Sequence, residues 1–208
     1  MPELGLFPLP LVLVPTERLP LHIFEPRYRE LIGECVETGG EFGIVFATGD
    51  GAVHEIGTRA AVTDVLEVLD DGRMNIIVQG LERFRLLELT HGRSFTTGIV
   101  EPVEDTHEPP DPADTERALE LFRRMLETAG PEVDLPDADS PSLAWELIAR
   151  AGFEPPAKQE LLALTSPRTR MHKLAELLSS ALETLRLSTA IRERASGNGR
   201  VTPPPETD

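Results

Sequence analysis

The sequence predicts an α+β protein in which a compact β region is followed by a bundle of helices. Residues 42–100 contain several short apolar runs separated by turn signals, a pattern typical of a barrel or a sandwich. After a proline-rich acidic stretch, apolar residues recur at helical spacing. We therefore divide the chain into a β domain (1–104), a linker (105–113), a helical bundle (114–194) and a disordered tail (195–208).

One helix is inserted early in the β region. Apolar residues alternate from Leu19 to Ile23, which predicts a half-buried strand. Because Pro20 has no backbone donor, this strand should start there or lie at a sheet edge. Glu25 and Pro26 then begin a helix over residues 26–37, since proline suits the first helical position and a carboxylate can cap the free amides. The apolar face of this helix comprises Tyr28, Leu31, Ile32 and Cys35.

The remaining strands are marked by turn residues. Residues 4–14 alternate apolar side chains with prolines, so we expect a short edge strand and then an extended segment. The run Asp70-Asp71-Gly72 between apolar segments predicts a hairpin. Gly80 is expected to break the returning strand, and residues 83–89 and 95–100 are expected to form two more strands.

Four helices are predicted after the linker. They begin near Asp111, Ser140, Lys158 and Ser166, and the last runs to about Arg194. Their apolar residues recur every three or four positions, which indicates a bundle with one buried face per helix. Trp145 lies outside the apolar stripe of the second helix, so we expect it to contact another part of the molecule.

The charge of the chain argues against several classes of partner. The net charge is −16, and residues 104–140 alone carry 12 acidic and 3 basic side chains. An acidic surface repels phosphates, so nucleic acids and anionic membranes are unfavourable partners. No run approaches the roughly 18 apolar residues of a membrane span, and no secretory leader is evident. We expect a cytoplasmic protein whose single cysteine, Cys35, is buried in a helix.

A search for catalytic patterns finds none. The chain has no P-loop and no Gly-x-Ser-x-Gly motif, and its five histidines are scattered. A dyad of Ser166 and Lys173 would be a nucleophile pattern, but Ser166 is better explained as a helix N-cap. The neighbouring carboxylates Glu104 and Asp105 are interpreted as solvated linker residues. We therefore expect no catalytic residue, no metal and no cofactor.

Four segments in order resemble the N-terminal, substrate-binding domain of Lon proteases, in particular its stand-alone bacterial forms. They are residues 6–9, the run from Leu19 to Tyr28, residues 54–58 and residues 80–84. The resemblance covers about residues 4–190 and implies a PUA-like β pseudobarrel followed by a helical bundle. It also implies a role in recognising protein substrates, because this region of Lon does so. The chain ends before an ATPase or peptidase domain could begin, so we expect no proteolysis by this chain alone.

We therefore interpret the chain as a non-catalytic binding module for unfolded or exposed segments of other proteins, such as an adaptor or a holdase-like factor. The candidate binding residues lie at the corner between the strand and the first helix: His22, Phe24, Glu25, Arg27 and Tyr28. Ordinary core packing is the alternative interpretation of Phe24 and Tyr28. Hydrogen bonding within the protein is the alternative for His22.

A second function class is RNA or small-ligand binding by the barrel, by analogy with other PUA-like folds. Arg83, Phe84 and Arg85 form the one basic and aromatic cluster in the β region. The net charge of −16 counts against this alternative. The oligomeric state and the physiological client are left open by the sequence.

Overall fold

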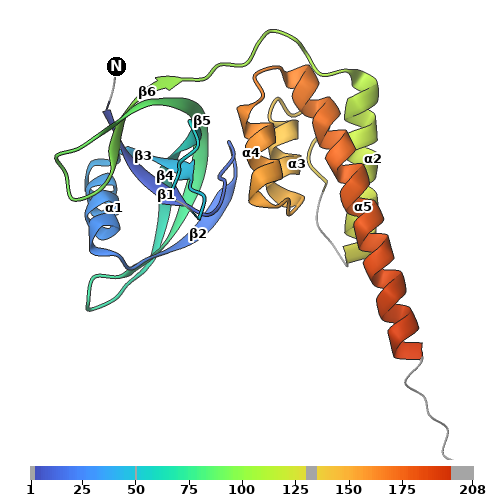
Figure 1. The fold of residues 1–208 in the computed structure, drawn as a ribbon, viewed down its shortest axis with the longest axis horizontal. Helices are drawn as coiled ribbons and strands as arrows, with labels where there is room; N and C mark the ends of the chain where they lie inside the picture. Colours follow the sequence, from blue (N-terminus) through green and yellow to red (C-terminus); the bar gives the residue numbers. More distant parts are fainter. Residues whose placement is uncertain (1–2, 50, 130–134, 198–208) are drawn as a thin grey trace, which may run out of the picture.

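The computed structural model describes residues 3–49, 51–129 and 135–197, and it shows a β-barrel beside a helical bundle (Figure 1). The strands are β1 (Glu3–Leu9), β2 (Arg18–Ile23), β3 (Glu41–Phe46), β4 (Ile56–Val68), β5 (Met74–Thr90) and β6 (Thr97–Pro102). The helices are α1 (Pro26–Thr38), α2 (Pro112–Ala129), α3 (Leu143–Arg150), α4 (Pro155–Ala163) and α5 (Pro167–Gly197). This is the α+β architecture that the sequence predicts: a pseudobarrel with one inserted helix, followed by helices.

The long strand β5 closes the barrel because its two halves have different partners. The sheet order is β2-β5-β4-β3-β1-β6, and β6 also pairs with β5. The first half of β5 pairs with β2, from Met74 opposite Ile23 to Gln79 opposite Arg18. Its second half pairs with β6, from Phe84 opposite Pro102 to Thr90 opposite Thr97. The strand β2 therefore lies at an edge, where the missing donor of Pro20 is tolerated.

Two of the strand predictions need correction. The strand β1 is not an edge strand, because it pairs with β3 in parallel and with β6 antiparallel. Gly80 does not break the returning strand, because β5 continues through it to Thr90. At Gly80 the chain passes so close to the β1–β2 connection that a Cβ atom would lie 2.1 Å from the carbonyl oxygen of Val14. Glycine is therefore needed there for a close backbone approach rather than for a strand end.

The helix α1 follows the predicted pattern and covers part of the barrel. Its inner face buries Tyr28, Leu31, Ile32 and Cys35 in a cluster that includes Ile76 and Val78 of β5. Gly39 ends the helix at a φ of 66°, a value that favours glycine. Glu25 occupies the N-cap position, but its side chain does not bond to a helix amide, contrary to the predicted cap. Its carboxylate instead accepts a hydrogen bond from Arg27.

The bundle differs from the predicted helices mainly at its ends. The helix α2 begins at Pro112, where Asp111 Oδ1 accepts a hydrogen bond from the Ala113 amide at 2.9 Å. The helix α5 continues to Gly197, so residues 195–197 are helical although they were expected to belong to the disordered tail. Residues 198–208 of that expected tail lie outside the described residues.

The barrel and the bundle share one hydrophobic cluster. The barrel contributes Val12, Val14, Phe46 and Ile56, and the bundle contributes residues from all four of its helices, including Trp145 and Leu161. Two polar contacts span the same junction. Lys158 of α4 pairs with Glu17 at 2.5 Å, and the side-chain amide of Gln159 donates to the Ile56 carbonyl oxygen at 2.9 Å. The junction is therefore packed and hydrogen-bonded like a domain interior.

Candidate functional site

The predicted corner presents an aromatic pair on a polar support. Phe24, between β2 and α1, is 59% exposed, and its ring stacks on His22 with a centroid distance of 5.9 Å. The imidazole of His22 is held by Asn75 of β5, because its Nδ1 donates to Asn75 Oδ1 at 2.7 Å. Asn75 Nδ2 in turn donates to Glu67 of β4 at 2.7 Å. The exposed ring of Phe24 thus has a side chain of fixed orientation beside it.

The other three predicted site residues divide between the surface and the core. Glu25 and Arg27 form an ion pair of 2.8 Å at the start of α1. Tyr28 is only 5% exposed, and its ring packs on Phe7 with a centroid distance of 4.1 Å. Burial raises the pKa of Tyr28, and the Arg27 guanidinium opposes that shift from 4.5 Å above the ring. We therefore correct the placement of Tyr28: it belongs to the core and supports the corner from beneath.

Two further exposed apolar side chains lie on β4. Leu66 and Val68 of β4 are 61% and 62% exposed. The pairing of β4 with β5 shifts between Val65 and Glu67, so Leu66 has no partner opposite it. A hollow of about 560 Å³ lies beside Leu66 and is also lined by residues of β2, β4 and β5: Pro20, Leu21, His22, Glu67, Asn75 and Ile76. We call Pro20, His22, Phe24 and Leu66 the corner surface. Val68 is not part of it, because Val68 lies opposite Met74 and so shares the face of Met74 and Ile23 rather than that of His22.

Sequence reasoning missed Leu66 because it lies in a continuous run of strand residues. It could face the core if β4 were regular, and the bulge that turns it outward has no local marker such as glycine. The one available signal is the pair of adjacent apolar residues Val65 and Leu66, since a regular half-buried strand would alternate.

The cluster considered for RNA binding does not form a surface. Arg83 and Phe84 are buried, and only Arg85 is exposed. Arg85 lies 3.8 Å from the carboxylate of Glu101 on the neighbouring strand. A basic face with accessible aromatic rings, which single-stranded RNA needs, is therefore not provided by these three residues.

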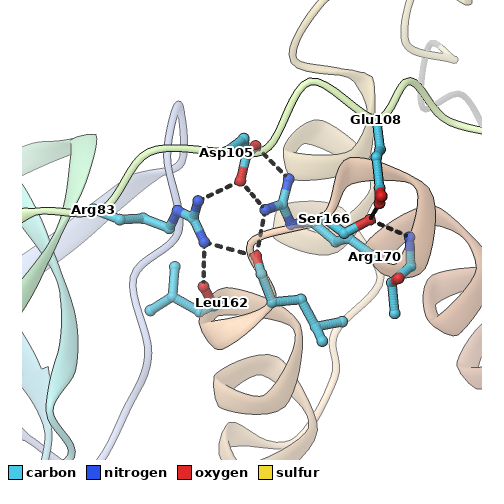
Figure 2. A network of polar contacts seen from close by, with 8 residues as sticks. Arg83, Asp105, Glu108, Leu162, Ser166 and Arg170 are labelled. Carbon is cyan, nitrogen blue, oxygen red and sulfur yellow. Dashed lines mark hydrogen bonds and ion pairs between the residues drawn. The ribbon is translucent and has the colours of Figure 1, made fainter.

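Arg83 instead belongs to a buried polar network between the barrel and the bundle (Figure 2). It donates to the carbonyl oxygens of Leu162 and Leu164 at 2.8 Å each, and to the carboxylate of Asp105. Asp105 also binds Arg170 of α5, which is 2% exposed. Asp105 is exposed, as expected of a linker residue, but the expectation missed that its carboxylate pairs with two buried guanidinium groups. Burial lowers the pKa of Arg83, and Asp105 opposes that shift.

Trp145 completes this network from α3. The guanidinium groups of Arg170 and Arg83 lie 4.0 and 5.3 Å from the centre of its indole ring. Trp145 thus contacts residues outside its own helix stripe, as expected, through cation–π interactions. The network joins β5, the linker, α3 and α5 around one carboxylate.

The remaining catalytic alternatives separate in space. Ser166 Oγ caps α5 by accepting from the Thr169 amide at 3.2 Å, and it donates to Glu108 at 2.7 Å. Lys173 pairs with Glu160 at 3.0 Å, so it does not form a dyad with Ser166. Within the part of the chain that the structure describes, no three His, Cys, Asp or Glu residues gather closely enough to hold a metal ion. Among the same residues, no helix has both the length and the apolar character to cross a membrane.

Comparison with known proteins decides the family. The model of the family described as the ATP-dependent protease La (LON) substrate-binding domain matches residues 3–180. The chain belongs to this family. A Lon N-terminal domain protein from Xanthomonas campestris superposes with a TM-score of 0.67 at 28% identity, covering 84% of this chain and 97% of that one. The N-terminal domain of a Mycobacterium avium complex Lon protease, at 15% identity, shares the fold with a TM-score of 0.64, covering 86% of this chain and 98% of that one.

Full-length relatives match over only part of their length. The Lon protease of Paraburkholderia phytofirmans is 34% identical over 154 residues, which are 70% of this chain and 19% of that protein. The Lon protease of Anaeromyxobacter dehalogenans is 29% identical over 203 residues, or 89% of this chain and 24% of that protein. The chain thus spans less than a quarter of the length of these relatives.

Two motifs of the Lon substrate-binding domain meet inside this barrel. Gly57, in the segment 54–58, lies opposite Phe84, in the segment 80–84, on the paired strands β4 and β5. A Cβ atom on Gly57 would lie 2.7 Å from the Phe84 ring and 2.6 Å from the Ile44 carbonyl oxygen. The two motifs therefore specify one packing contact, in which the small residue makes room for the aromatic ring.

Proposed function

We propose that this chain binds apolar segments exposed on other polypeptides, and that the corner surface is the contact site. The observation that carries this proposal is the exposure of two large apolar side chains, Phe24 and Leu66, on either side of His22: Phe24 stacks on it, and Leu66 lines the same hollow as it does. Soluble proteins rarely leave such side chains grouped in water unless they contact a partner. Membership of the Lon substrate-binding domain family supports a protein as that partner.

The chemistry of the corner surface fits recognition of a side chain rather than catalysis. Phe24 offers an aromatic face whose burial against a partner would contribute about 2 kcal/mol. Pro20 and Leu66 border the hollow of about 560 Å³, which is large enough for an apolar side chain of a peptide. His22 and Asn75 are already bonded to each other, so they orient the surface without losing a partner on binding. The surface would recognise apolar character rather than one sequence.

This function requires no nucleotide, metal or proteolytic step by the chain itself. An adaptor would present the bound segment to a second protein, whereas a holdase-like factor would keep it from aggregating. Both roles use the same contact, and they differ in whether binding alone suppresses aggregation of an unfolded client. The setting we propose is cytoplasmic.

The direct test is fluorescence anisotropy of a labelled, permanently unfolded polypeptide titrated with the purified chain at low and high salt. We expect micromolar binding that changes little with salt, and a loss of about tenfold for Phe24→Ser because aromatic anchors dominate interfaces. Leu187→Ser is the matched control, since Leu187 is 66% exposed, close to the value for Phe24, but lies on α5. Equal losses for both variants, or binding that weakens steeply with salt, would refute the proposed contact site.

A further inference from the structure

A second and larger hollow lies in the helical bundle, away from the corner surface. It has a volume of about 970 Å³ and is bordered by the linker, α2, α3 and α5. Its apolar lining includes Leu119, Trp145 and Met171, with Pro109 and Pro141 from the connecting segments. Hollows of about 300–1,000 Å³ with mainly apolar walls are the usual size of ligand sites.

The polar network leaves one hydrogen-bond donor of Arg170 unused beside this hollow. Both terminal nitrogens of Arg170 are bonded to Asp105, and one also donates to Leu164. Its Nε atom is buried and has no partner, although Arg170 lines the hollow and is 2% exposed. Unpaired buried donors are uncommon, and a bound carbonyl oxygen would satisfy one.

The charges around the hollow define the occupant more closely. Three carboxylates lie on its exposed rim: Glu108, Glu116 and Asp139. Asp105 pairs with both Arg170 and Arg83, so this group keeps one net positive charge, which offsets only one of the three rim carboxylates. The rim is therefore anionic around an apolar floor, which repels acidic ligands and attracts cationic ones.

We propose that this hollow binds a peptide segment in which an apolar side chain is flanked by lysine or arginine. The apolar side chain lies against Trp145 and Leu119, and a backbone carbonyl of the segment accepts the unused donor of Arg170. The flanking cations pair with Glu116 and Asp139. This site is separate from the corner surface, and it would add a charge preference that the corner surface lacks.

Trp145 allows a direct test, because it is the only tryptophan in the chain and lines the hollow. The probe is a short capped peptide with a central Lys-Phe-Lys in a Gly/Ser background, titrated at low salt while Trp145 emission is recorded. Two matched peptides carry Glu-Phe-Glu and Lys-Ser-Lys. We expect the Lys-Phe-Lys peptide to bind about tenfold more tightly than either matched peptide. It alone carries both the cations that pair with the anionic rim and the apolar side chain that packs on the floor of the hollow.

Two variants place the binding in the hollow. Ala144→Phe fills space beside Trp145 and should reduce affinity for the Lys-Phe-Lys peptide at least about tenfold. Glu116→Lys changes one exposed rim charge without touching the core, and should reduce affinity several-fold while removing part of the salt dependence. Glu116→Lys keeps the test decisive if Ala144→Phe does not fold.

The outcomes separate this site from the corner surface. Phe24→Ser should leave the Trp145 titration unchanged, and Glu116→Lys should leave binding of the unfolded polypeptide at high salt unchanged. Equal affinity for the lysine and glutamate peptides, no response of Trp145 emission, or unchanged binding by both hollow variants would each overturn the proposal. A loss of Trp145 response in Phe24→Ser would show that only one site exists, at the corner.

Discussion

Asp105 and Arg170 form a two-point ion pair, in which Arg170 Nη1 donates to Asp105 Oδ2 at 2.8 Å and Nη2 donates to Oδ1 at 2.5 Å. The same carboxylate binds Arg83 of the barrel (Figure 2). Both arginines are buried, and among the described residues Asp105 is the only carboxylate that pairs with them. A residue of the connecting segment thus holds the barrel and the bundle in a fixed relation.

Replacing Asp105 should therefore be costly. Asp105→Asn leaves two buried guanidinium groups without a counter-charge, and we expect the free energy of unfolding to fall by about 3 kcal/mol. The measurement is urea unfolding followed by circular dichroism. Glu104→Gln is the matched control, because it removes a neighbouring charge that is exposed, and it should change stability by less than about 0.5 kcal/mol. Equal changes in the free energy of unfolding for the two variants would mean that the Asp105 network contributes no more to stability than an exposed linker charge does.

Glu17 and Lys158 should show coupled energies across the same junction. Their ion pair is nearly buried, and Glu17 also accepts the Val14 amide at 2.9 Å. We expect Glu17→Gln and Lys158→Met to destabilise the chain singly, and the double variant to cost less than their sum by about 1–2 kcal/mol. Unfolding free energies of the four proteins in a double-mutant cycle measure this coupling. Strict additivity would show that the pair contributes only through packing.

Elements with local signals could be predicted from the sequence. Pro26 and Gly39 mark the two ends of α1, and Gly72 occupies the hairpin turn at a φ of 81°. The edge position of β2 follows from Pro20, and the burial of Cys35 follows from its place on the helix face. In each case a single residue restricts the backbone, or a short period defines one face, so no distant contact is needed.

The parts that were missed depend on pairing between distant residues. Asp105 lies 22 residues from Arg83 and 65 from Arg170, and no local pattern relates them. Gly80 resembles a strand end until Val14 is placed against it. Leu66 faces solvent because of a bulge whose position depends on the register with β5. Of the candidate site, the sequence motif predicts His22 and Phe24, whereas including Leu66 required the structure.

Cys35 should be an unreactive thiol in the folded chain. Burial raises its pKa to about 11, and the neighbouring Glu34 carboxylate adds to that shift. A rise of about two pH units means about 100-fold less thiolate near pH 8, in addition to restricted access. Reaction with a thiol reagent should therefore be at least 100-fold slower in the native chain than in urea, by about the same estimate. The reaction rate of the native chain should still increase with pH above about pH 9, where the reaction rate of the unfolded chain no longer does. A fast native reaction at neutral pH would contradict the buried position.

Gly80 and Gly33 should respond to alanine with opposite signs. A Cβ atom at Gly80 would meet the Val14 carbonyl oxygen at 2.1 Å, and that oxygen belongs to backbone that cannot rotate away. Two backbone hydrogen bonds of 2.8 Å also span this contact. The Thr16 amide donates to the Gly80 carbonyl oxygen, and the Gly80 amide donates to the Glu17 carbonyl oxygen. We expect Gly80→Ala to lower the free energy of unfolding by at least about 2 kcal/mol.

Gly33 offers the matched control because it lies within α1 and a Cβ atom there would meet nothing within 4 Å. Gly33→Ala should raise the free energy of unfolding by about 0.5–1 kcal/mol, since alanine loses less backbone entropy than glycine on forming a helix. Chemical denaturation of both variants under identical conditions checks the pair. If Gly80→Ala were as stable as the parent chain, the β1–β2 connection would have to lie farther from β5 than the structure places it, and the closure of the barrel at this point would need revision.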